Sequence, residues 1–307
     1  MSRIKHEPRA SFAFIGSCRA GSSWFFEILR EHPQVVLPQN KGTLFFSNLY
    51  DMGVAWYEGF YPTRLDGRIA GEVCERYLSS PEALARIRGY RPDMRLICCI
   101  RNPYERAVSA WRFFVRNGVG MPSIAAEGIL HPDIFRNGYY ATQLGVAREL
   151  FPEHQLLVIV FDDLARRPEA VARQVYAFIG ADPDFVPSSL RRRVNGNAVP
   201  RSRSLARLVH DVHMRSWGRS RWASKAVGML KRIRPLRRLV VTALYRDESR
   251  SADWADFIPA FPEEVVARYE QEIRALEKML RRDLSHWHAP AAGAAGTDPR
   301  TTRAGAS

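Results

Sequence analysis

A basic loop between two glycines, and then a hydroxyl pair, follow the first apolar run of this 307-residue chain. Residues 12–24 read FAFIGSCRAGSSW, in which Arg19 precedes Gly21 and the hydroxyl pair Ser22 and Ser23. This order is typical of a phosphate site, because a helix N-terminus directs backbone N–H groups and its dipole at an anion. A nucleoside-triphosphate loop has its phosphate-binding lysine where this chain has Ser22. The loop therefore predicts a nucleotide with a short phosphate chain and no bound metal.

A second basic group follows another apolar run. Residues 96–100 read LICCI, a pattern typical of a buried strand, and Arg101 comes directly after them. Pro103 fits the first turn of a helix, which places Ser109 about two turns into it. Ligands of open parallel sheets bind outside the carboxyl ends of strands, so Arg101 and the 16–23 loop would share one crevice if their strands are neighbours. The forked guanidinium of Arg101 suits bidentate binding of a second phosphate.

These two motifs resemble those of the sulfotransferases that use 3′-phosphoadenosine 5′-phosphosulfate (PAPS). The first resembles their 5′-phosphosulfate loop, commonly K-x-G-T-T-W, and the second, R-N-P-Y-E-R-A-V-S, resembles their 3′-phosphate signature. Further similarity to bacterial and heparan-type members is found in residues 31–35, 41–46, 56–57, 71–72, 161–164 and 282–287. The resemblance implies a metal-independent enzyme that transfers a sulfuryl group to a hydroxyl or amino group, on a carbohydrate or glycolipid acceptor.

The resemblance also implies roles for single residues. The groups around the phosphosulfate would be loop residues and one downstream lysine: Arg19, Gly21, Ser22, Ser23 and Lys41. Trp24 would lie near the nucleotide base, while Arg101 and Ser109 would hold the 3′-phosphate. Residues 191–201 resemble a late loop that folds over the donor in this family. Within that loop, Arg193 and Arg201 are the candidate cations.

Arg19 departs from the family pattern, because most members have a lysine at this place. Arginine carries the same charge, but its high pKa makes it a poor proton donor to a leaving group. We therefore expect Arg19 to stabilise, electrostatically, the charge that develops on the departing phosphate. Ser22 and Ser23 replace the usual threonines and retain the hydroxyl.

The acceptor base is the second departure. Heparan-type members have a Lys-Glu pair shortly before two phenylalanines, and the glutamate acts as base on the acceptor. In this chain Gly42 follows Lys41, so that carboxylate is missing. Glu72 is the replacement candidate, and a structural acceptor role for it is the equal alternative. Glu75 and His32 come behind it, although His32 is better suited to cap the end of a helix.

Alternating strand and helix patterns predict an α/β fold of three layers, α/β/α, with a central parallel sheet of the P-loop nucleotide-binding type. Strands are expected near residues 11–16, 69–73, 96–100 and 156–161. Helices are expected near residues 22–31, 81–88, 103–116, 140–150, 168–179 and 262–281. We interpret residues 1–288 as one sulfotransferase domain, and residues 289–307, rich in small residues and proline, as a disordered tail.

The composition of the chain indicates its cellular compartment and whether it binds a metal. No apolar run is long enough to span a bilayer, and residues 1–16 lack a signal-peptide pattern. The four cysteines have no metal-ligand spacing, so we expect reduced, mostly buried thiols and no metal site. We therefore expect a cytoplasmic location, either free or in peripheral contact with the inner face of the membrane.

The formal net charge of +14 is concentrated in residues 191–250, where the acidic residues are Asp211, Asp247 and Glu248. This segment, with an amphipathic pattern at 222–245, predicts contact with a polyanion or an anionic membrane surface. A solvated surface is the alternative. We expect no nucleic-acid partner, because no recognised nucleic-acid-binding module is found. The sequence leaves the oligomeric state open.

Two other functions remain open at this stage. A small-molecule kinase would share the sheet and the loop, but it would need a lysine for the γ-phosphate and a magnesium ion. A polyanion-binding protein with an idle nucleotide site is the other alternative, because Gly42 replaces the family glutamate. It would bind polyanions in a salt-sensitive way without turnover.

Overall fold

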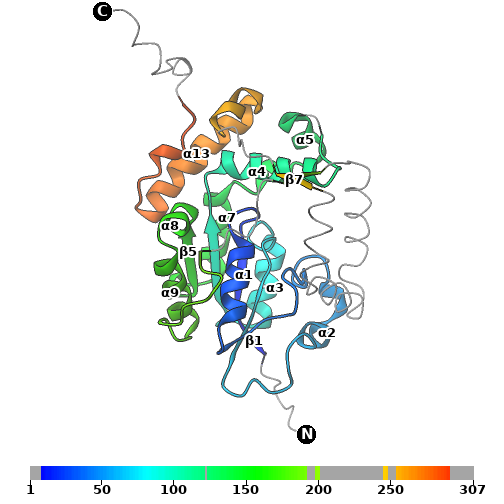
Figure 1. Ribbon diagram of the computed structural model, residues 1–307, viewed down its shortest axis with the longest axis vertical. Coiled ribbons are helices and arrows are strands. Elements are labelled where there is room, and N and C mark those ends of the chain that lie inside the picture. The colour runs from blue at the N-terminus through cyan, green and yellow to red at the C-terminus, as the bar shows by residue number, and fades with distance from the viewer. Residues whose placement is uncertain (1–7, 122, 192–197, 201–244, 248–253, 291–307) are drawn as a thin grey trace, which may run out of the picture.

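A five-stranded parallel sheet lies between two layers of helices in the computed structural model, which describes residues 8–121, 123–191, 198–200, 245–247 and 254–290 (Figure 1). The strands in sheet order are β2 (Val35–Val36), β3 (Ile69–Val73), β1 (Ala10–Gly16), β4 (Arg95–Ile100) and β5 (Leu156–Val160). All four pairings are parallel. The carboxyl ends of the strands therefore meet at one edge of the sheet.

The central strand β1 shows why the apolar runs become buried strands. Successive side chains of a strand point to opposite faces. Phe12 and Phe14 accordingly join one core cluster, and Ala13 and Ile15 join a second cluster across the sheet. All four residues are fully buried. A strand covered on both faces needs this continuous apolar sequence.

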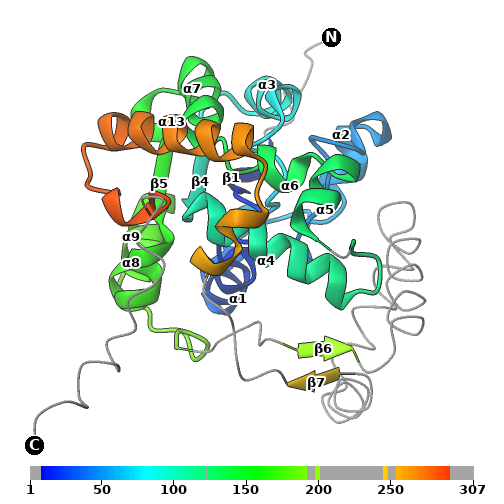
Figure 2. The ribbon, with the colours of Figure 1, turned by 90° about the horizontal axis from the view of Figure 1, so that it is seen from above.

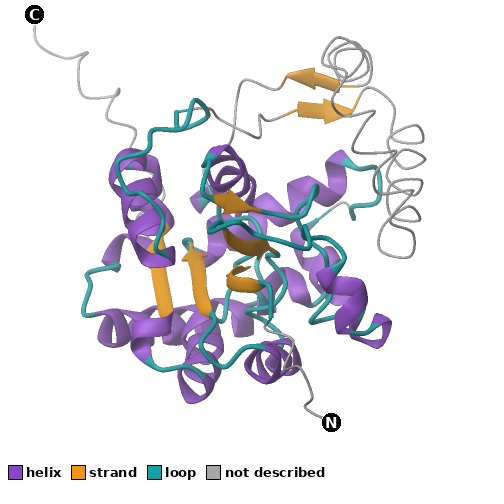
Figure 3. Cartoon of the chain, turned by 90° about the horizontal axis from the view of Figure 1, so that it is seen from below, coloured by secondary structure: helices purple, strands orange, loops and turns teal. Residues whose placement is uncertain are grey.

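The two faces are covered by different helices (Figures 2 and 3). The face with Ala13 and Ile15 packs with residues of α3 (Pro81–Tyr90), α4 (Pro103–Arg116), α7 (Tyr140–Leu150) and α13 (Glu263–Leu280). The opposite face packs with residues of α1 (Ser22–Glu31) and α9 (Pro168–Ile179). This arrangement confirms the expected α/β fold with three layers and a central parallel sheet.

Shorter elements complete the described residues. They are the helices α2 (Val54–Glu58), α5 (Ile124–Leu130), α6 (Asp133–Arg136) and α8 (Phe161–Arg166), the 3-10 turns η1 (Tyr50–Met52), η2 (Glu153–Gln155), η3 (Ala255–Ala260) and η4 (Ser285–Trp287), and the antiparallel strand pair β6 (Ala198–Pro200) and β7 (Tyr245–Asp247).

The prediction for the residues around Phe161 was wrong, because a helix replaces the expected strand end and turn. The sequence predicted a strand through Phe161 and then a turn, whereas β5 ends at Val160 and α8 begins at Phe161. Asp162 and Asp163 fall in the first turn of α8, where carboxylates interact favourably with the helix dipole. The helix consequently starts directly at the sheet edge.

Several expectations lie outside the described residues. These include Arg193 and Arg201, most of the basic segment 191–250 with its amphipathic pattern at 222–245, and the tail from residue 291 onward. Among the helices that are described, none is both long enough and apolar enough to cross a membrane.

Candidate functional site

The loop between β1 and α1 depends on its two glycines. A Cβ added to Gly16 would lie 2.9 Å from Leu78 Cβ and 3.2 Å from the carbonyl oxygen of Glu75. Gly21 has a φ of 90°, in the left-handed region, and its added Cβ would lie 2.9 Å from Leu164 Cδ2. Glycine is the residue that meets both requirements, an unusual φ and a close approach.

The start of α1 is built to receive an anion. Gly21 is the N-cap residue and provides no side-chain cap, and the first turn contains no acidic residue. Ser22 is buried and Ser23 is partly exposed at this end. Helix N-termini carry N–H groups without intrahelical acceptors, together with a positive dipole end. Two hydroxyls and the open helix end thus converge at the carboxyl edge of the sheet.

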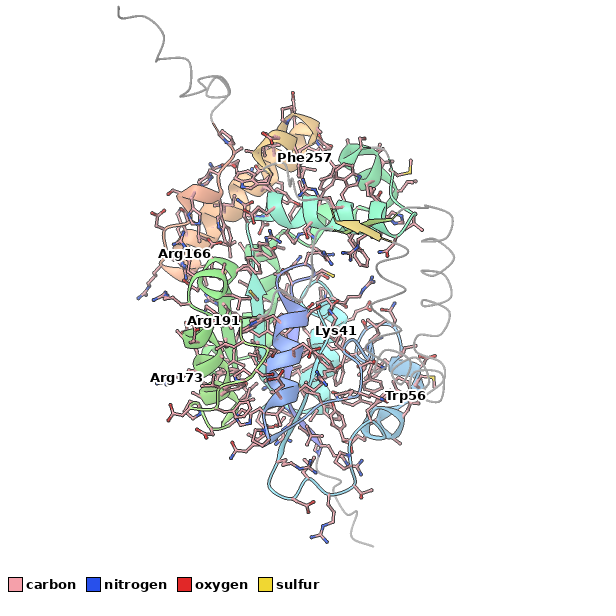
Figure 4. The ribbon with its side chains drawn as sticks, viewed as in Figure 1. Lys41, Trp56, Arg166, Arg173, Arg191 and Phe257 are labelled. Carbon is pink, nitrogen blue, oxygen red and sulfur yellow. The ribbon has the colours of Figure 1, made fainter. Side chains whose placement is uncertain are left out.

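Lys41 reaches this helix start from another segment and lies beside α1 (Figure 4). Its Nζ donates to Ser22 Oγ at 2.9 Å and lies 3.5 Å from Glu75 Oε1. The backbone N–H of Gly42 donates to the carbonyl of Val73 at 2.7 Å, which fixes the segment to the end of β3. Lys41 therefore adds a positive charge to the predicted phosphosulfate site.

Arg101 lies at the junction of β4 and α4. Asn102 caps the helix, because its Oδ1 accepts hydrogen bonds from the backbone N–H groups of Tyr104 and Glu105. Arg101 Nε donates to Glu105 Oε2 at 2.8 Å, and the guanidinium lies 4.7 Å from the centre of the Phe161 ring. The cap, the ion pair and the ring hold Arg101 at the sheet edge.

The two motifs come together directly. Strand β1 pairs with β4, as a shared site requires. Arg101 Nη1 donates to the carbonyl of Arg19 at 3.5 Å, and Arg19 Nε donates to Ser109 Oγ at 3.3 Å. Arg19 has a left-handed φ of 69° and lies 4.9 Å from the centre of the Phe113 ring. Residues some 90 positions apart in sequence thus form one contiguous group of cations and hydroxyls.

Positive charge is crowded in this group. Burial, followed by the nearby charge of Arg116 and with Arg101 adding to it, lowers the pKa of Arg19 to about 10. Arg19 is still a cation at neutral pH. Like charges at close range repel, and a bound anion removes that cost. The electrostatics of the site therefore favour an anionic ligand.

Glu72, the candidate base, has the contacts of a structural residue. It is fully buried. Thr43 Oγ1 donates to its Oε2 at 2.6 Å, and the hydroxyls of Tyr57 and Tyr77 donate to its Oε1 at 2.9 and 3.2 Å. Burial raises its pKa to about 7, against the opposing effect of these hydrogen bonds. A base must first be within reach of its substrate, so the geometry favours the structural alternative.

The raised pKa of Glu72 predicts how the stability of the folded protein depends on pH. The Glu72 carboxyl group binds its proton more tightly in the folded protein than in the unfolded chain. Its contribution to the free energy of unfolding is therefore complete below about pH 4.5 and is lost as the pH rises through about 7. Glu72→Gln should remove this dependence, which amounts to about 3 kcal/mol between the two limits. Urea unfolding of wild type and variant from pH 4 to 9 measures it. Glu82→Gln, on the exposed surface of α3, is the control, and an unchanged pH profile in Glu72→Gln would contradict the assignment.

Two other candidates have structural contacts. The Trp24 indole is buried and donates through Nε1 to the carbonyl of Leu190 at 2.8 Å. Its proximity to the nucleotide base stays a prediction. His32 is the C-cap residue of α1, buried between the rings of Tyr176 and Phe185, as expected for a terminus-capping role.

Sequence reasoning missed the rings that support the arginines. Phe113 lies under the guanidiniums of Arg19 and Arg116, and Phe161 lies under that of Arg101. The spacing of Phe113, four residues after Ser109, was the available signal, because residues at i and i+4 share a helix face. The position of Phe161 at the start of α8 gave no comparable signal.

The thiols are arranged as expected from the sequence. All four cysteines are free, and Cys74, Cys98 and Cys99 are buried. Burial is the main cause that raises the pKa of each of these three thiols above its ordinary value. Within the described ranges, no group of three or more His, Cys, Asp or Glu side chains is arranged to hold a metal ion.

Comparison with known proteins links this site to one family. Residues 13–198 match the sequence profile described as "Sulfotransferase domain". Heparan sulfate glucosamine 3-O-sulfotransferase 6 of Mus musculus is 33% identical over 174 residues, which cover 54% of this chain and 51% of that protein. Heparan sulfate glucosamine 3-O-sulfotransferase 3B1 of Homo sapiens is 30% identical over 188 residues, or 58% and 47% of the two chains. The chain spans about half the length of these curated relatives.

Solved structures share the fold. The sulfotransferase from Alicyclobacillus acidocaldarius has a TM-score of 0.62 at 21% identity, covering 91% of this chain and 98% of that one. Mouse sulfotransferase SULT7A1, complexed with PAP, has a TM-score of 0.51 at 13% identity, covering 91% and 86%. The family match spans both phosphate motifs and more than half of the chain. Because this sequence match covers more than half of the chain, and because the fold agrees with it, the chain belongs to the sulfotransferase family.

Proposed function

We propose that this chain is an enzyme that transfers a sulfuryl group from PAPS to an acceptor hydroxyl or amino group. The observation that carries the proposal is the contact between the two motifs, in which Arg101 reaches the Arg19 carbonyl and Arg19 reaches Ser109. PAPS carries a phosphosulfate on its 5′ oxygen and a phosphate on its 3′ oxygen. The open start of α1 with Lys41 suits the first group, and Arg101 suits the second.

A carbohydrate is the proposed acceptor. The curated relatives are named for glucosamine in heparan sulfate, which is an anionic polysaccharide. The arginine-rich composition of residues 191–250 supports an anionic polymer as the acceptor. A glycolipid is a second form of the same chemistry, and it fits the proposed cytoplasmic location with contact at the inner membrane face.

A transfer assay tests this function. The protein is incubated with ³⁵S-labelled PAPS and a panel of heparan-derived oligosaccharides, glycolipids, and simple alcohols and amines, with and without EDTA. We expect label on a carbohydrate acceptor, at a rate that EDTA does not change. In a parallel incubation with γ-labelled ATP in place of PAPS, phosphorylation that EDTA abolishes would instead identify a kinase. Salt-sensitive binding of the polysaccharide without transfer would identify a binding protein.

A further inference from the structure

The order of the strands separates a donor side of the sheet edge from an acceptor side. Arg101 follows β4 and the phosphate loop follows β1, so the proposed nucleotide spans these two neighbouring strands. In an in-line transfer, the acceptor attacks sulfur from the side opposite to the leaving phosphate. On the other side of β1 lies β3. The acceptor therefore approaches over the carboxyl end of β3.

Glu75 is found at that end. It lies two residues beyond β3, in a segment held against β1 by backbone hydrogen bonds. The N–H of Cys74 donates to the carbonyl of Phe14, and the N–H of Leu78 donates to that of Ile15, both at 2.8 Å. The segment runs so close to the loop that a Cβ on Gly16 would lie 3.2 Å from the Glu75 carbonyl oxygen. Glu75 is thereby fixed beside the start of the phosphate loop.

The carboxylate of Glu75 differs from that of Glu72. Its side chain is 21% exposed, whereas Glu72 is fully buried. Its Oε1 makes a loose contact of 3.5 Å with Lys41 Nζ, and its Oε2 is buried without a hydrogen-bond partner among the described residues. A buried acceptor without a partner is unfavourable, and a proton or a donor group relieves that cost. Glu75 therefore has a carboxylate oxygen free to accept from an incoming donor group.

We propose that Glu75 is the general base that activates the acceptor, in place of the glutamate that Gly42 replaces; this inference rests on the proposed sulfuryl transfer. The acceptor O–H or N–H gives its proton to the Glu75 carboxylate, while its lone pair forms the bond to sulfur. The bond from sulfur to the bridging oxygen breaks, and its electron pair stays on the 5′-phosphate, next to Arg19.

Lys41 makes this arrangement electrostatically possible. A carboxylate beside a sulfuryl group would otherwise repel the anionic donor. The Lys41 ammonium contacts both the Glu75 carboxylate and the Ser22 hydroxyl at the start of α1. One cation is thus shared between the base and the donor site, and the negative charge of Glu75 need not weaken donor binding.

Glu75→Gln tests the base, because it keeps the shape and the contact with Lys41 but does not act as a base. With labelled PAPS and the acceptor that the wild type sulfates best, we expect kcat to fall at least about 100-fold. The Kd for 3′-phosphoadenosine 5′-phosphate (PAP), measured by calorimetry, should stay within about threefold of the wild type, since the base does not contact the product nucleotide. Glu75→Asp keeps a carboxylate and should recover part of the lost rate.

A purely structural Glu75 gives a different pattern. If it only oriented Lys41, Glu75→Gln would keep that contact and a kcat near the wild-type value, whereas Glu75→Ala would weaken PAP binding in parallel with Lys41→Ala. A kcat near the wild-type value in Glu75→Gln would overturn the inference. Glu72→Gln is the matched carboxylate control and should keep its turnover at neutral pH. A wild type that binds PAP but sulfates no acceptor would refute the proposed function, and the inference with it.

Discussion

Arg101→Ala is expected to lower the affinity for PAP by about 100-fold. Charge-assisted hydrogen bonds from a forked guanidinium to phosphate contribute up to about 3 kcal/mol, and each 1.4 kcal/mol corresponds to about tenfold in affinity. The substitution removes the guanidinium that β4, the Asn102 cap and Phe161 hold at the sheet edge. Calorimetric titration with PAP measures the loss.

A second ligand shows whether this loss belongs to the 3′-phosphate. Adenosine 5′-monophosphate lacks that phosphate, so Arg101→Ala should change its Kd by no more than about threefold, because no contact is removed. Arg166→Ala, an exposed arginine of α8 labelled in Figure 4, controls for the loss of one positive charge. Equal losses for both nucleotides would place Arg101 elsewhere than at the 3′-phosphate.

Arg19→Ala is expected to lower kcat by about 10²–10³-fold, the range found when a group that stabilises transition-state charge is removed. Arg19 is held between Ser109 and the Phe113 ring, and the charges of Arg116 and Arg101 lie near it. Its charge is therefore already in place, and little reorganisation is needed when the leaving phosphate gains charge. Single-turnover transfer at saturating PAPS isolates this effect from donor binding.

Arg19→Lys separates charge from shape. Lysine restores the residue that most family members have at this place, so we expect it to recover most of the rate. Both variants keep a side chain at the left-handed φ of 69°, and any strain there is shared by them. A transfer rate in Arg19→Ala within about threefold of the wild type would show that Arg19 stabilises no charge during transfer.

The sequence predicted the sheet well where its apolar runs are long. The runs at 12–16, 96–100 and 156–160 became β1, β4 and β5, because strands covered on both faces need continuous apolar sequence. Strand β2 was missed, since its two residues, Val35 and Val36, are too few to show a period. Helix α8 was missed because Phe161 continues the apolar pattern of the strand before it.

The candidate site was predictable in part. The loop and Arg101 could be expected to meet, because both follow strands at the carboxyl edge of one sheet. The hydroxyls of Thr43, Tyr57 and Tyr77 donate hydrogen bonds to the Glu72 carboxylate. These contacts decide that Glu75, and not Glu72, is open to a ligand. Such contacts form only in the tertiary structure, so the spacing of the two glutamates could not reveal them.

Calorimetry of the wild type with PAP and with adenosine 5′-monophosphate tests whether Arg101 and the loop at α1 hold two phosphates of one nucleotide. In metal-free buffer we expect PAP to bind at least about 100-fold more tightly than adenosine 5′-monophosphate, because one well-placed phosphate contact contributes a free energy of that size. Equal affinities for the two nucleotides, or tighter binding of ATP than of PAP in a separate titration with magnesium, would contradict this arrangement.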